Sequence, residues 1–148
     1  MSNFNWGILG PGGIAKAFAT DLQLLDGHAV AAVGSRTLKN AQEFAKTFGG
    51  TPYGSYEELV ADPTVDAIYV ATPHPAHKDN VIAALNAGKP VLCEKPFAVN
   101  AKEAAEQILL GAETTAVGGV PAQGACWVVP AAANDQLLVP LAPQLARI

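Results

Sequence analysis

Lys95 stands out in this 148-residue chain as a residue placed for acid/base chemistry. It lies in the segment Cys93-Glu94-Lys95-Pro96, directly after a short apolar run of the kind that forms a buried parallel strand. Open α/β sheets place their ligands at the carboxyl ends of their strands. Pro96 restricts the preceding residue to extended conformations, which keeps Lys95 out of a helix. We predict that Lys95 is a catalytic residue that polarises a hydroxyl or carbonyl group; the alternative is an ordinary Lys-Pro turn at the surface.

A glycine-rich turn near the N-terminus has the form of a phosphate-binding loop. The sequence GILGPGGIA places Gly10, Gly12 and Ala15 at the three small positions of the dinucleotide fingerprint. Gly10 permits a tight turn, Gly12 leaves room for a pyrophosphate, and Ala15 allows the following helix to pack closely. The amides of Gly13 and Ile14 then lie at a helix N-terminus, where free N–H groups favour an anion. The alternative is a glycine-rich turn without a ligand, but its position between a strand and an amphipathic helix favours a nucleotide.

The residues after the second apolar run indicate which dinucleotide binds. An NAD site carries an acidic residue there to hold the ribose hydroxyls, and this chain has Ser35 and Arg36 instead. Ser35 can hydrogen-bond a 2′-phosphate, Arg36 offers it a planar charged contact, and Lys39 follows one turn later as support. These residues predict NADP as the cofactor, with NAD less favoured. The alternative is that Arg36 is an ordinary surface residue.

Two histidines follow the apolar run that ends at Thr72. We expect Thr72, Pro73, His74 and His77 to line the cofactor or substrate crevice, because they stand at the mouth of a predicted strand. His74 and His77 are three residues apart, but a metal site needs further ligands and no third candidate stands out. We therefore predict no metal site.

These candidate residues need a sheet and flanking helices to bring them together. Short apolar runs predict buried strands at residues 5–10, 29–35, 66–72 and 90–94. Apolar residues at spacings of three or four predict helices between these strands. Strands separated by such helices must run parallel, so the predicted fold class is α/β, a doubly wound parallel sheet of the Rossmann type. The first helix is expected to bury Ile14, Phe18, Leu22 and Leu25.

Local signals place the ends of the predicted helices. Ser55 and Glu58 form a capping box at the start of a short helix, and Asn100 and Glu103 form another before the last predicted helix. Gly88 is expected to end the helix that follows the histidines.

The last quarter of the chain differs in character from the rest. Charged residues become rare there and prolines punctuate alanine- and valine-rich stretches. We predict a single Rossmann-type domain at residues 1–110 and an irregular tail at residues 111–148. AVGGV (116–120) and ACWVV (125–129) are the candidate short strands in this tail.

Composition limits the classes of partner and the compartment. The net charge of -4 argues against a nucleic-acid partner, because neutralising phosphates needs clustered Lys and Arg. The chain has no apolar run of the roughly 18 residues that cross a bilayer, and its N-terminus does not read as a signal peptide. Cys93 and Cys126 fall in no metal or redox spacing. We expect no membrane partner and a cytoplasmic location.

The sequences GILGPGGIA, YGSYEELVADPTVDAIYVATPHPAHK and VLCEKPFAVNAKEA together resemble the Gfo/Idh/MocA oxidoreductases, closest to their dihydrodiol and D-xylose dehydrogenase branch. The resemblance covers residues 4 to about 110. It implies transfer of a hydride between a nicotinamide and the CH–OH group of a small-molecule substrate, a sugar or a cyclic diol.

The resemblance also implies roles for particular residues. Lys95 is expected to work beside the nicotinamide and the substrate, while Glu94 and Pro96 shape the turn that completes the cofactor site. Thr72, Pro73 and His77 are expected to line the cofactor crevice. The usual asparagine two residues after the threonine is His74 here, which departs from the family's pattern of cofactor contacts.

The resemblance further marks what the chain lacks. Family members continue into a second α/β domain, of about the size of a further whole domain, that carries most substrate contacts and a Tyr or His acid/base group. This chain has no Tyr or His after His77 and no Lys after Lys102. We expect a truncated or frame-shifted product: an NADP(H)-binding portion of an oxidoreductase with little or no turnover alone.

One alternative uses the same residues: a non-catalytic NADP-binding module that senses redox state or partners another chain. A further possibility is a homo-oligomer that forms through apolar surface, because the tail leaves the sheet edge and the helices uncovered.

Overall fold

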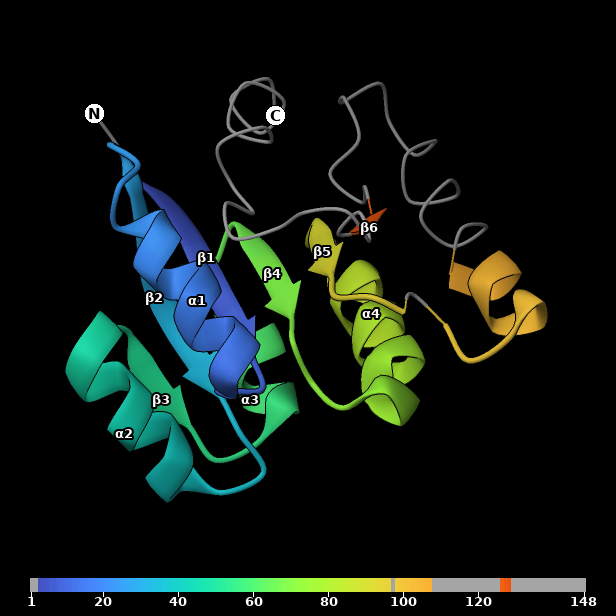
Figure 1. Ribbon diagram of the computed structural model, residues 1–148, viewed down its shortest axis with the longest axis horizontal. Coiled ribbons are helices and arrows are strands. Elements are labelled where there is room, and N and C mark those ends of the chain that lie inside the picture. The colour runs from blue at the N-terminus through green and yellow to red at the C-terminus, as the bar shows by residue number, and fades with distance from the viewer. Residues whose placement is uncertain (1–2, 97, 108–125, 129–148) are drawn as a thin grey trace.

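A computed structural model describes residues 3–96, 98–107 and 126–128 of the chain (Figure 1). The strands are β1 (Phe4–Leu9), β2 (His28–Gly34), β3 (Thr51–Tyr53), β4 (Ala67–Val70), β5 (Val91–Cys93) and β6 (Cys126–Val128). The helices are α1 (Gly13–Leu22), α2 (Leu38–Phe48), α3 (Tyr56–Val60), the short 3-10 helix η1 (His74–Ala76) and α4 (His77–Asn86). Residues 101–107 form a further helix.

The described strands form one parallel sheet in the order β3-β2-β1-β4-β5-β6. After β3 the chain returns across the sheet and β4 pairs with the free side of β1, so the direction of winding reverses between β1 and β4. Helices α1 and α2 cover one face of the sheet, and α3 and α4 cover the other (Figure 1). The predicted fold class, a doubly wound parallel sheet of the Rossmann type, is confirmed. In such sheets the ligand crevice lies at the carboxyl ends of the strands where the winding reverses.

The central strands bury side chains on both faces of the sheet. In β4, Tyr69 packs into the core beneath α1, whereas Ile68 and Val70 pack into the core beneath α4. Successive side chains of a strand point to opposite faces, so a strand covered on both faces is apolar at nearly every position. This explains why the central strands read as uninterrupted apolar runs in the sequence.

The buried face of α1 differs from the prediction at both ends of the helix. Phe18 is buried as predicted, but Ile14 is 44% exposed. Leu25 lies beyond the end of the helix and is only partly buried. Ala15 and Ala19 take the positions of closest approach to the sheet, because their small side chains let the helix lie near the strands.

The edge strand β3 is missing from the prediction. It is three residues long and contains Pro52, which lacks the N–H of a central strand residue but is tolerated at a sheet edge. The N-cap half of each predicted capping box is present: the Ser55 hydroxyl accepts a hydrogen bond from the Glu58 amide (3.2 Å), and Asn100 Oδ1 accepts one from the Glu103 amide (3.0 Å). The carboxylate of Glu103 accepts from the Val99 amide (3.4 Å), one residue before the expected donor.

A part of the predicted tail joins the sheet. The stretch ACWVV contains β6, which pairs in parallel with β5 and places Val128 opposite Cys93. The candidate strand in this stretch is therefore confirmed, and it extends the sheet beyond β5. The other candidate strand, at residues 116–120, lies outside the described residues, as does the predicted boundary at residue 110.

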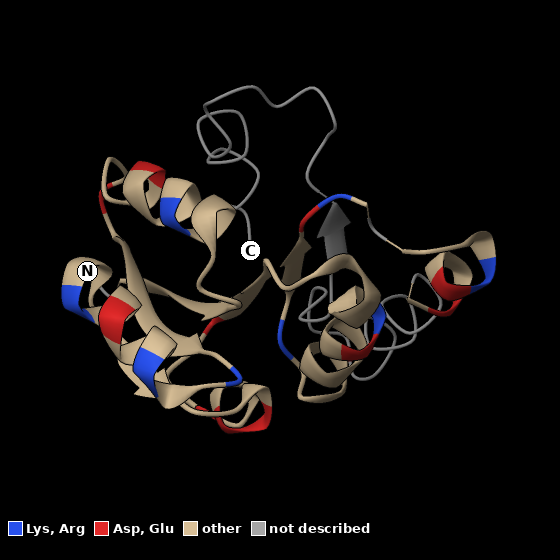
Figure 2. Cartoon of the chain, turned by 60° about the horizontal axis from the view of Figure 1, so that its bottom comes forward, with Lys and Arg blue, Asp and Glu red and all other residues tan. Residues whose placement is uncertain are grey.

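Acidic and basic residues both occur along the helices of the described chain (Figure 2). None of the helices in the described ranges is both long enough and apolar enough to span a bilayer.

Asp62 ties together the loop that leads from α3 to β4. Its carboxylate is buried and accepts hydrogen bonds from the Tyr53 hydroxyl (3.0 Å) and from the amide and hydroxyl of Thr64 (2.8 and 2.7 Å). Burial acts to raise the pKa of Asp62, but the hydrogen bonds from Thr64 and Tyr53 and the charge of Lys89 outweigh it, so this pKa lies below its usual value.

Asp62→Ala is expected to lower the free energy of unfolding at neutral pH by about 1–3 kcal/mol, because it leaves the Tyr53 and Thr64 donors without their acceptor. A carboxyl group whose pKa is lowered by folding stabilises the protein at pH values above its unfolded pKa of about 4. That stabilisation is lost as the pH falls through the pKa of the folded protein. Urea unfolding at neutral and acidic pH measures both effects. The exposed Asp26→Ala is the matched control, and equal stability of Asp62→Ala and wild type at neutral pH would contradict this account.

Candidate dinucleotide-binding site

Gly10 makes the turn between β1 and α1 tight. Its φ of 87° lies in the left-handed region, and a Cβ atom there would stand 2.9 Å from the Ala71 carbonyl oxygen. Its amide donates to the Gly34 carbonyl (3.0 Å), and its own carbonyl accepts from the Gly12 amide (2.9 Å). Glycine alone suits this conformation and this close approach. The turn therefore brings the start of α1 against the end of β4.

The first turn of α1 forms a cradle of backbone amides. The Lys16 amide donates to the Gly12 carbonyl (3.1 Å), and this is the first backbone hydrogen bond of the helix. The amides of Gly13, Ile14 and Ala15 therefore have no acceptor within the helix, and the helix dipole adds partial positive charge there. A Cβ atom at Gly12 or Gly13 would meet no atom within 4 Å apart from its chain neighbours and its own helix, and both residues line an open pocket. The donors and the open space fit a diphosphate.

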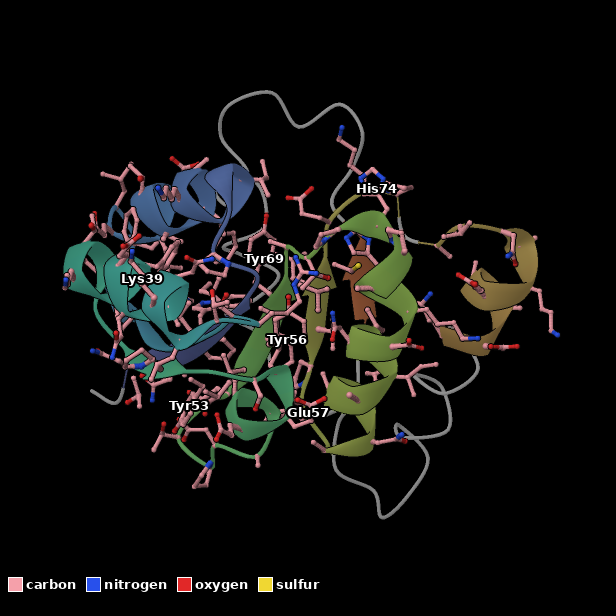
Figure 3. All side chains as sticks on the ribbon, turned by 90° about the horizontal axis from the view of Figure 1, so that it is seen from below. Lys39, Tyr53, Tyr56, Glu57, Tyr69 and His74 are labelled. Carbon is pink, nitrogen blue, oxygen red and sulfur yellow. The ribbon has the colours of Figure 1, made fainter. Side chains whose placement is uncertain are left out.

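A pocket of about 670 Å³ opens in front of this amide cradle. It lies at the carboxyl ends of the central strands. Figure 3 shows this edge of the sheet and labels Tyr56 and His74, which line the pocket. A volume of this size is typical of cofactor sites. The lining residues are Gly10, Pro11, Gly12, Gly13, Ile14, Ser35, Arg36, Thr37, Asn40, Tyr56, Ala71, Thr72, Pro73 and His74. The structure thus brings together the predicted glycine loop, the Ser35-Arg36 pair and the turn after Thr72.

The Ser35-Arg36 end of this pocket combines a fixed hydroxyl with an exposed cation. Ser35 is buried; its amide donates to the Tyr53 carbonyl (3.2 Å), and its hydroxyl accepts from the Thr37 amide (3.4 Å). Arg36 lines the pocket and is exposed. Lys39 lies on α2, exposed and outside the lining of the pocket (Figure 3). A supporting contact from Lys39 to a phosphate stays a prediction.

Three polar residues of the pocket wall are missing from the sequence prediction. They are Thr37, Asn40 and Tyr56. Thr37 and Asn40 lie at the start of α2, and Tyr56 is the first residue of α3. Their signal in the sequence is positional, because residues at the start of a helix that follows a parallel strand lie at the carboxyl edge of the sheet.

A smaller pocket of about 230 Å³ continues the main pocket toward β5. Its lining residues are Ile14, Ala71, Thr72, His74, His77, Glu94 and Lys95, of which the first four also line the main pocket. Lys95 is exposed at this pocket and is joined to Pro96 by a cis peptide bond. Pro96 itself does not line either pocket. The structure therefore places Arg36 and Lys95 in two adjoining pockets that share four lining residues, and we call these two pockets together the hollow.

His77 is buried and bridges two backbone segments. Its Nε2 lies 2.7 Å from the Thr72 carbonyl and its Nδ1 lies 2.8 Å from the Pro96 carbonyl. Both ring nitrogens of His77 face protein carbonyls, so its predicted contact with the cofactor crevice stays a prediction. The His74 ring packs edge-on against His77 at 5.5 Å. Within the described ranges, no three His, Cys, Asp or Glu side chains come together as metal ligands.

Two further polar residues support the site and are missing from the prediction. Asn80 is buried and its amide nitrogen donates to the Thr72 hydroxyl (3.0 Å). Tyr69 is buried and its hydroxyl donates to Glu94 Oε1. Burial, and then the hydrogen bond and charge of Glu94, raise the pKa of Tyr69 well above its usual value. A tyrosine within an otherwise aliphatic buried strand signals that its hydroxyl needs a partner, and this signal is readable in the sequence.

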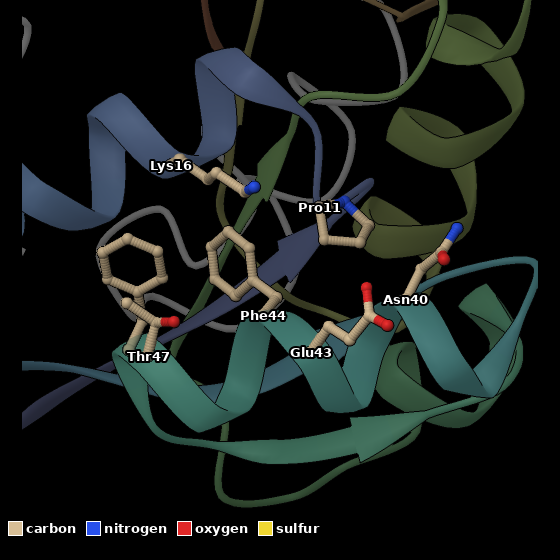
Figure 4. Close-up of a pocket in the computed structure, with 7 residues that line it drawn as sticks. Pro11, Lys16, Asn40, Glu43, Phe44 and Thr47 are labelled. Atoms are coloured by element: carbon tan, nitrogen blue, oxygen red, sulfur yellow. The ribbon is translucent and has the colours of Figure 1, made fainter.

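A third pocket, of about 310 Å³, lies between α1 and α2 (Figure 4). Lys16 borders it from α1, and Glu43, Phe44 and Thr47 border it from α2. Pro11 and Asn40 line both this pocket and the main one. The third pocket therefore borders the main pocket at these two residues.

The reversed parallel sheet, the glycine turn and the amide cradle define a dinucleotide-binding domain of the Rossmann class. Residues 4–120 match the oxidoreductase family with an NAD-binding Rossmann fold, Gfo/Idh/MocA. The chain belongs to this family, and the resemblance drawn from its motifs is confirmed.

The curated relatives are longer than this chain. Trans-1,2-dihydrobenzene-1,2-diol dehydrogenase of Mus musculus is 51% identical over 106 residues, which cover 70% of this chain and 32% of that protein. D-xylose 1-dehydrogenase (NADP(+)) of Hypocrea jecorina is 46% identical over 112 residues, which cover 67% of this chain and 29% of that protein. The chain thus spans about a third of the length of these relatives.

Solved structures share the fold over most of the chain. KijD10, a 3-ketoreductase from Actinomadura kijaniata in complex with TDP-benzene and NADP, has a TM-score of 0.73 at 32% identity, covering 76% of this chain and 36% of its own. An NAD binding oxidoreductase from Klebsiella pneumoniae has a TM-score of 0.75 at 28% identity, covering 86% of this chain and 34% of its own. Together with the family match, these structures mark the chain as an NAD(P)-binding oxidoreductase domain.

Proposed function

We propose that the chain is the NADP(H)-binding portion of an oxidoreductase that transfers hydride between a nicotinamide and the CH–OH group of a sugar or cyclic diol. The observation that carries this proposal is that Arg36, the amide cradle of α1 and Lys95 line two adjoining pockets that share four lining residues. A dinucleotide has its diphosphate in the middle, with the 2′-phosphate on one side and the nicotinamide on the other. The order of groups along the hollow suits this molecule.

Each part of the hollow has a separate task in this proposal. The amides of Gly13 and Ile14 donate to the diphosphate, and Ser35 and Arg36 hold the 2′-phosphate. The bound nicotinamide supplies or accepts the hydride. Lys95 Nζ holds the substrate oxygen and moves a proton to or from it.

The choice of NADP over NAD rests on the Ser35-Arg36 end of the hollow. A carboxylate at this place would hold ribose hydroxyls and repel a 2′-phosphate, whereas Arg36 offers that phosphate a bidentate, charge-assisted contact. Among the relatives, the xylose dehydrogenase is named for NADP(+), and KijD10 is described in complex with NADP. These names support the same choice.

The substrate proposed is a small molecule with a CH–OH group. The relatives named above act on a cyclic diol and on a sugar. The small pocket beside Lys95, of about 230 Å³, leaves this lysine exposed. Because hydride transfer benefits from a site closed to water, we propose that the chain alone turns over slowly or not at all.

Titration of the purified full chain with NADPH, followed by cofactor fluorescence, tests the binding proposal. We expect saturable binding of NADPH, and an affinity for NADH that is lower by about tenfold or more. If well-folded protein shows no saturation with either cofactor, the proposed function is wrong. Equal affinities would keep the dinucleotide site and remove the preference for NADP.

Assays with aldoses and cyclic diols test the proposal about turnover separately. The same protein preparation is mixed with NADP(+) and each alcohol, and NADPH formation is followed. We expect rates close to the background without protein. Sustained, protein-dependent reduction of the cofactor would contradict the proposed lack of activity while supporting the proposed substrate class.

A further inference from the structure

Tyr69 lies inside the protein between α1 and the turn that carries Lys95. It is fully buried, and its ring stacks on Phe18 of α1 with ring centroids 3.9 Å apart and an angle of 14° between the planes. Phe18 belongs to the same helix whose first turn forms the amide cradle. Tyr69 thus contacts the element that would hold the diphosphate.

The hydroxyl of Tyr69 reaches the other side of the site through Glu94. It donates a hydrogen bond to Glu94 Oε1, and Glu94 Oε2 accepts one from the Lys95 amide (3.2 Å). The Glu94 amide in turn donates to the Val70 carbonyl (3.0 Å). Glu94 is only 6% exposed, so its carboxylate depends on these protein donors rather than on water. The carboxylate therefore links the phenol to the backbone of Lys95.

We propose that Tyr69 is a positioning residue that, through Glu94, fixes the backbone of Lys95 at a set place relative to the amide cradle of α1. A reacting group must be held to within about 0.5 Å by neighbours that are themselves locked by packing and hydrogen bonds. The Lys95 side chain is exposed, whereas Tyr69 and Glu94 are buried. We call the hydrogen bonds from Tyr69 through Glu94 to the Lys95 amide the clamp. The importance of the clamp for hydride transfer rests on the proposed function, but its existence does not.

Packing alone does not account for the hydroxyl of Tyr69. Phenylalanine would stack on Phe18 equally well and would remove the need to satisfy a buried polar group. Burial and the contact with Glu94 keep the pKa of Tyr69 high, so the phenol stays protonated and acts as a hydrogen-bond donor. The hydroxyl is therefore the part of the residue that the clamp uses.

Hydrogen exchange of the Lys95 amide, measured by NMR on the full chain without cofactor, tests the clamp. Tyr69→Phe keeps the ring and removes the donor to Glu94. We expect exchange at Lys95, taken relative to exchange at the core residue Ile8, to rise about tenfold, because the Glu94 carboxylate no longer keeps its position. Tyr53→Phe is the matched control, since it removes a hydroxyl that donates to Asp62 and not to the site. A relative exchange rate in Tyr69→Phe equal to that of the control would overturn the proposal.

A double-mutant cycle with Glu94→Gln keeps the proposal testable if Tyr69→Phe folds poorly. Glutamine is close in size to glutamate, but its amide nitrogen cannot accept a hydrogen bond, so one of the two links is broken. If Tyr69 acts through Glu94, adding Tyr69→Phe to Glu94→Gln should change the relative exchange at Lys95 by less than about twofold. A further tenfold rise in the double variant would mean that Tyr69 acts by another route, and the proposal would be wrong.

The outcome for the clamp is separable from the outcome for the proposed function. The exchange measurement needs no cofactor, whereas the NADPH titration needs no variant. Failure of NADPH to bind would remove the proposed function and leave the exchange result to decide on Tyr69. Unchanged exchange in Tyr69→Phe, with normal NADPH binding to the wild type, would remove the clamp and leave the cofactor site in place.

Discussion

Gly12→Val is expected to abolish binding of both NADPH and NADH while the protein stays folded. A Cβ atom at Gly12 meets no protein atom within 4 Å, and the φ of -87° at this residue suits any side chain. The valine methyl groups would instead occupy the open space in front of the Gly13 and Ile14 amides, where the proposed diphosphate lies. Valine is a poorer N-cap than glycine and costs about 1 kcal/mol of stability. Calorimetric titration with each cofactor measures the loss of binding.

Gly10→Ala provides the contrast that separates binding from folding. A Cβ atom at Gly10 would lie 2.9 Å from the Ala71 carbonyl oxygen, and the φ of 87° is strained for alanine. This variant is therefore expected to lose stability, seen as a lower midpoint in urea unfolding, together with binding. Unchanged cofactor affinity in folded Gly12→Val would show that the glycine loop is not the phosphate cradle.

The sequence predicts the central sheet well because burial on both faces leaves a strong local signal. The central strands β1 and β4 are short apolar runs whose side chains enter both cores. The segments that form helices between strands have apolar residues at helical spacing. Such a pattern depends on the residues of one element and on nothing distant. The edge strand β3 has no such signal, because it is short and contains proline. It is a strand because it pairs with β2, which is distant from β3 in the sequence.

The predicted burial of Ile14 was wrong for a reason that concerns function. Ile14 fits the helical spacing of Phe18 and Leu22, but it lies in the first turn of α1 and is 44% exposed. There it lines both parts of the hollow instead of the core. Periodicity tells which side of a helix an apolar residue is on, but it does not tell where the underlying sheet ends.

The candidate site could be predicted where a residue type has a local reason to be there. Glycines in a turn after a strand, and a basic residue in place of an acid, are such signals, and the structure places Gly12 and Arg36 in one hollow. Asn80 and Tyr69 are different, since each serves the site through one hydrogen bond to another part of the fold, over 8 residues for Asn80 and 25 for Tyr69. Their partners, Thr72 and Glu94, become known only when α4 is packed against the sheet and β4 is aligned with β5.

Arg36→Ala is expected to weaken NADPH binding by about 1.5–3 kcal/mol, or about 10- to 150-fold, and to leave NADH binding nearly unchanged. The two cofactors differ only in the 2′-phosphate, so a side chain that contacts this group affects one cofactor and not the other. Arg36 lines the main pocket beside the buried Ser35, whose hydroxyl is held at the wall. Fluorescence titrations of both cofactors at the same ionic strength measure the difference.

Lys46→Ala is the matched control for Arg36→Ala. It also removes one positive charge from the chain, but Lys46 lies in the last turn of α2, is exposed and does not line the pocket. A general electrostatic attraction would make the two variants lose NADPH affinity to a similar extent, and that loss would shrink as salt is added. A direct contact with the 2′-phosphate would make the loss large for Arg36→Ala alone. Equal losses of NADPH and NADH affinity in Arg36→Ala would mean that the guanidinium acts on a part common to both cofactors, and the predicted preference for NADP would lose its structural basis.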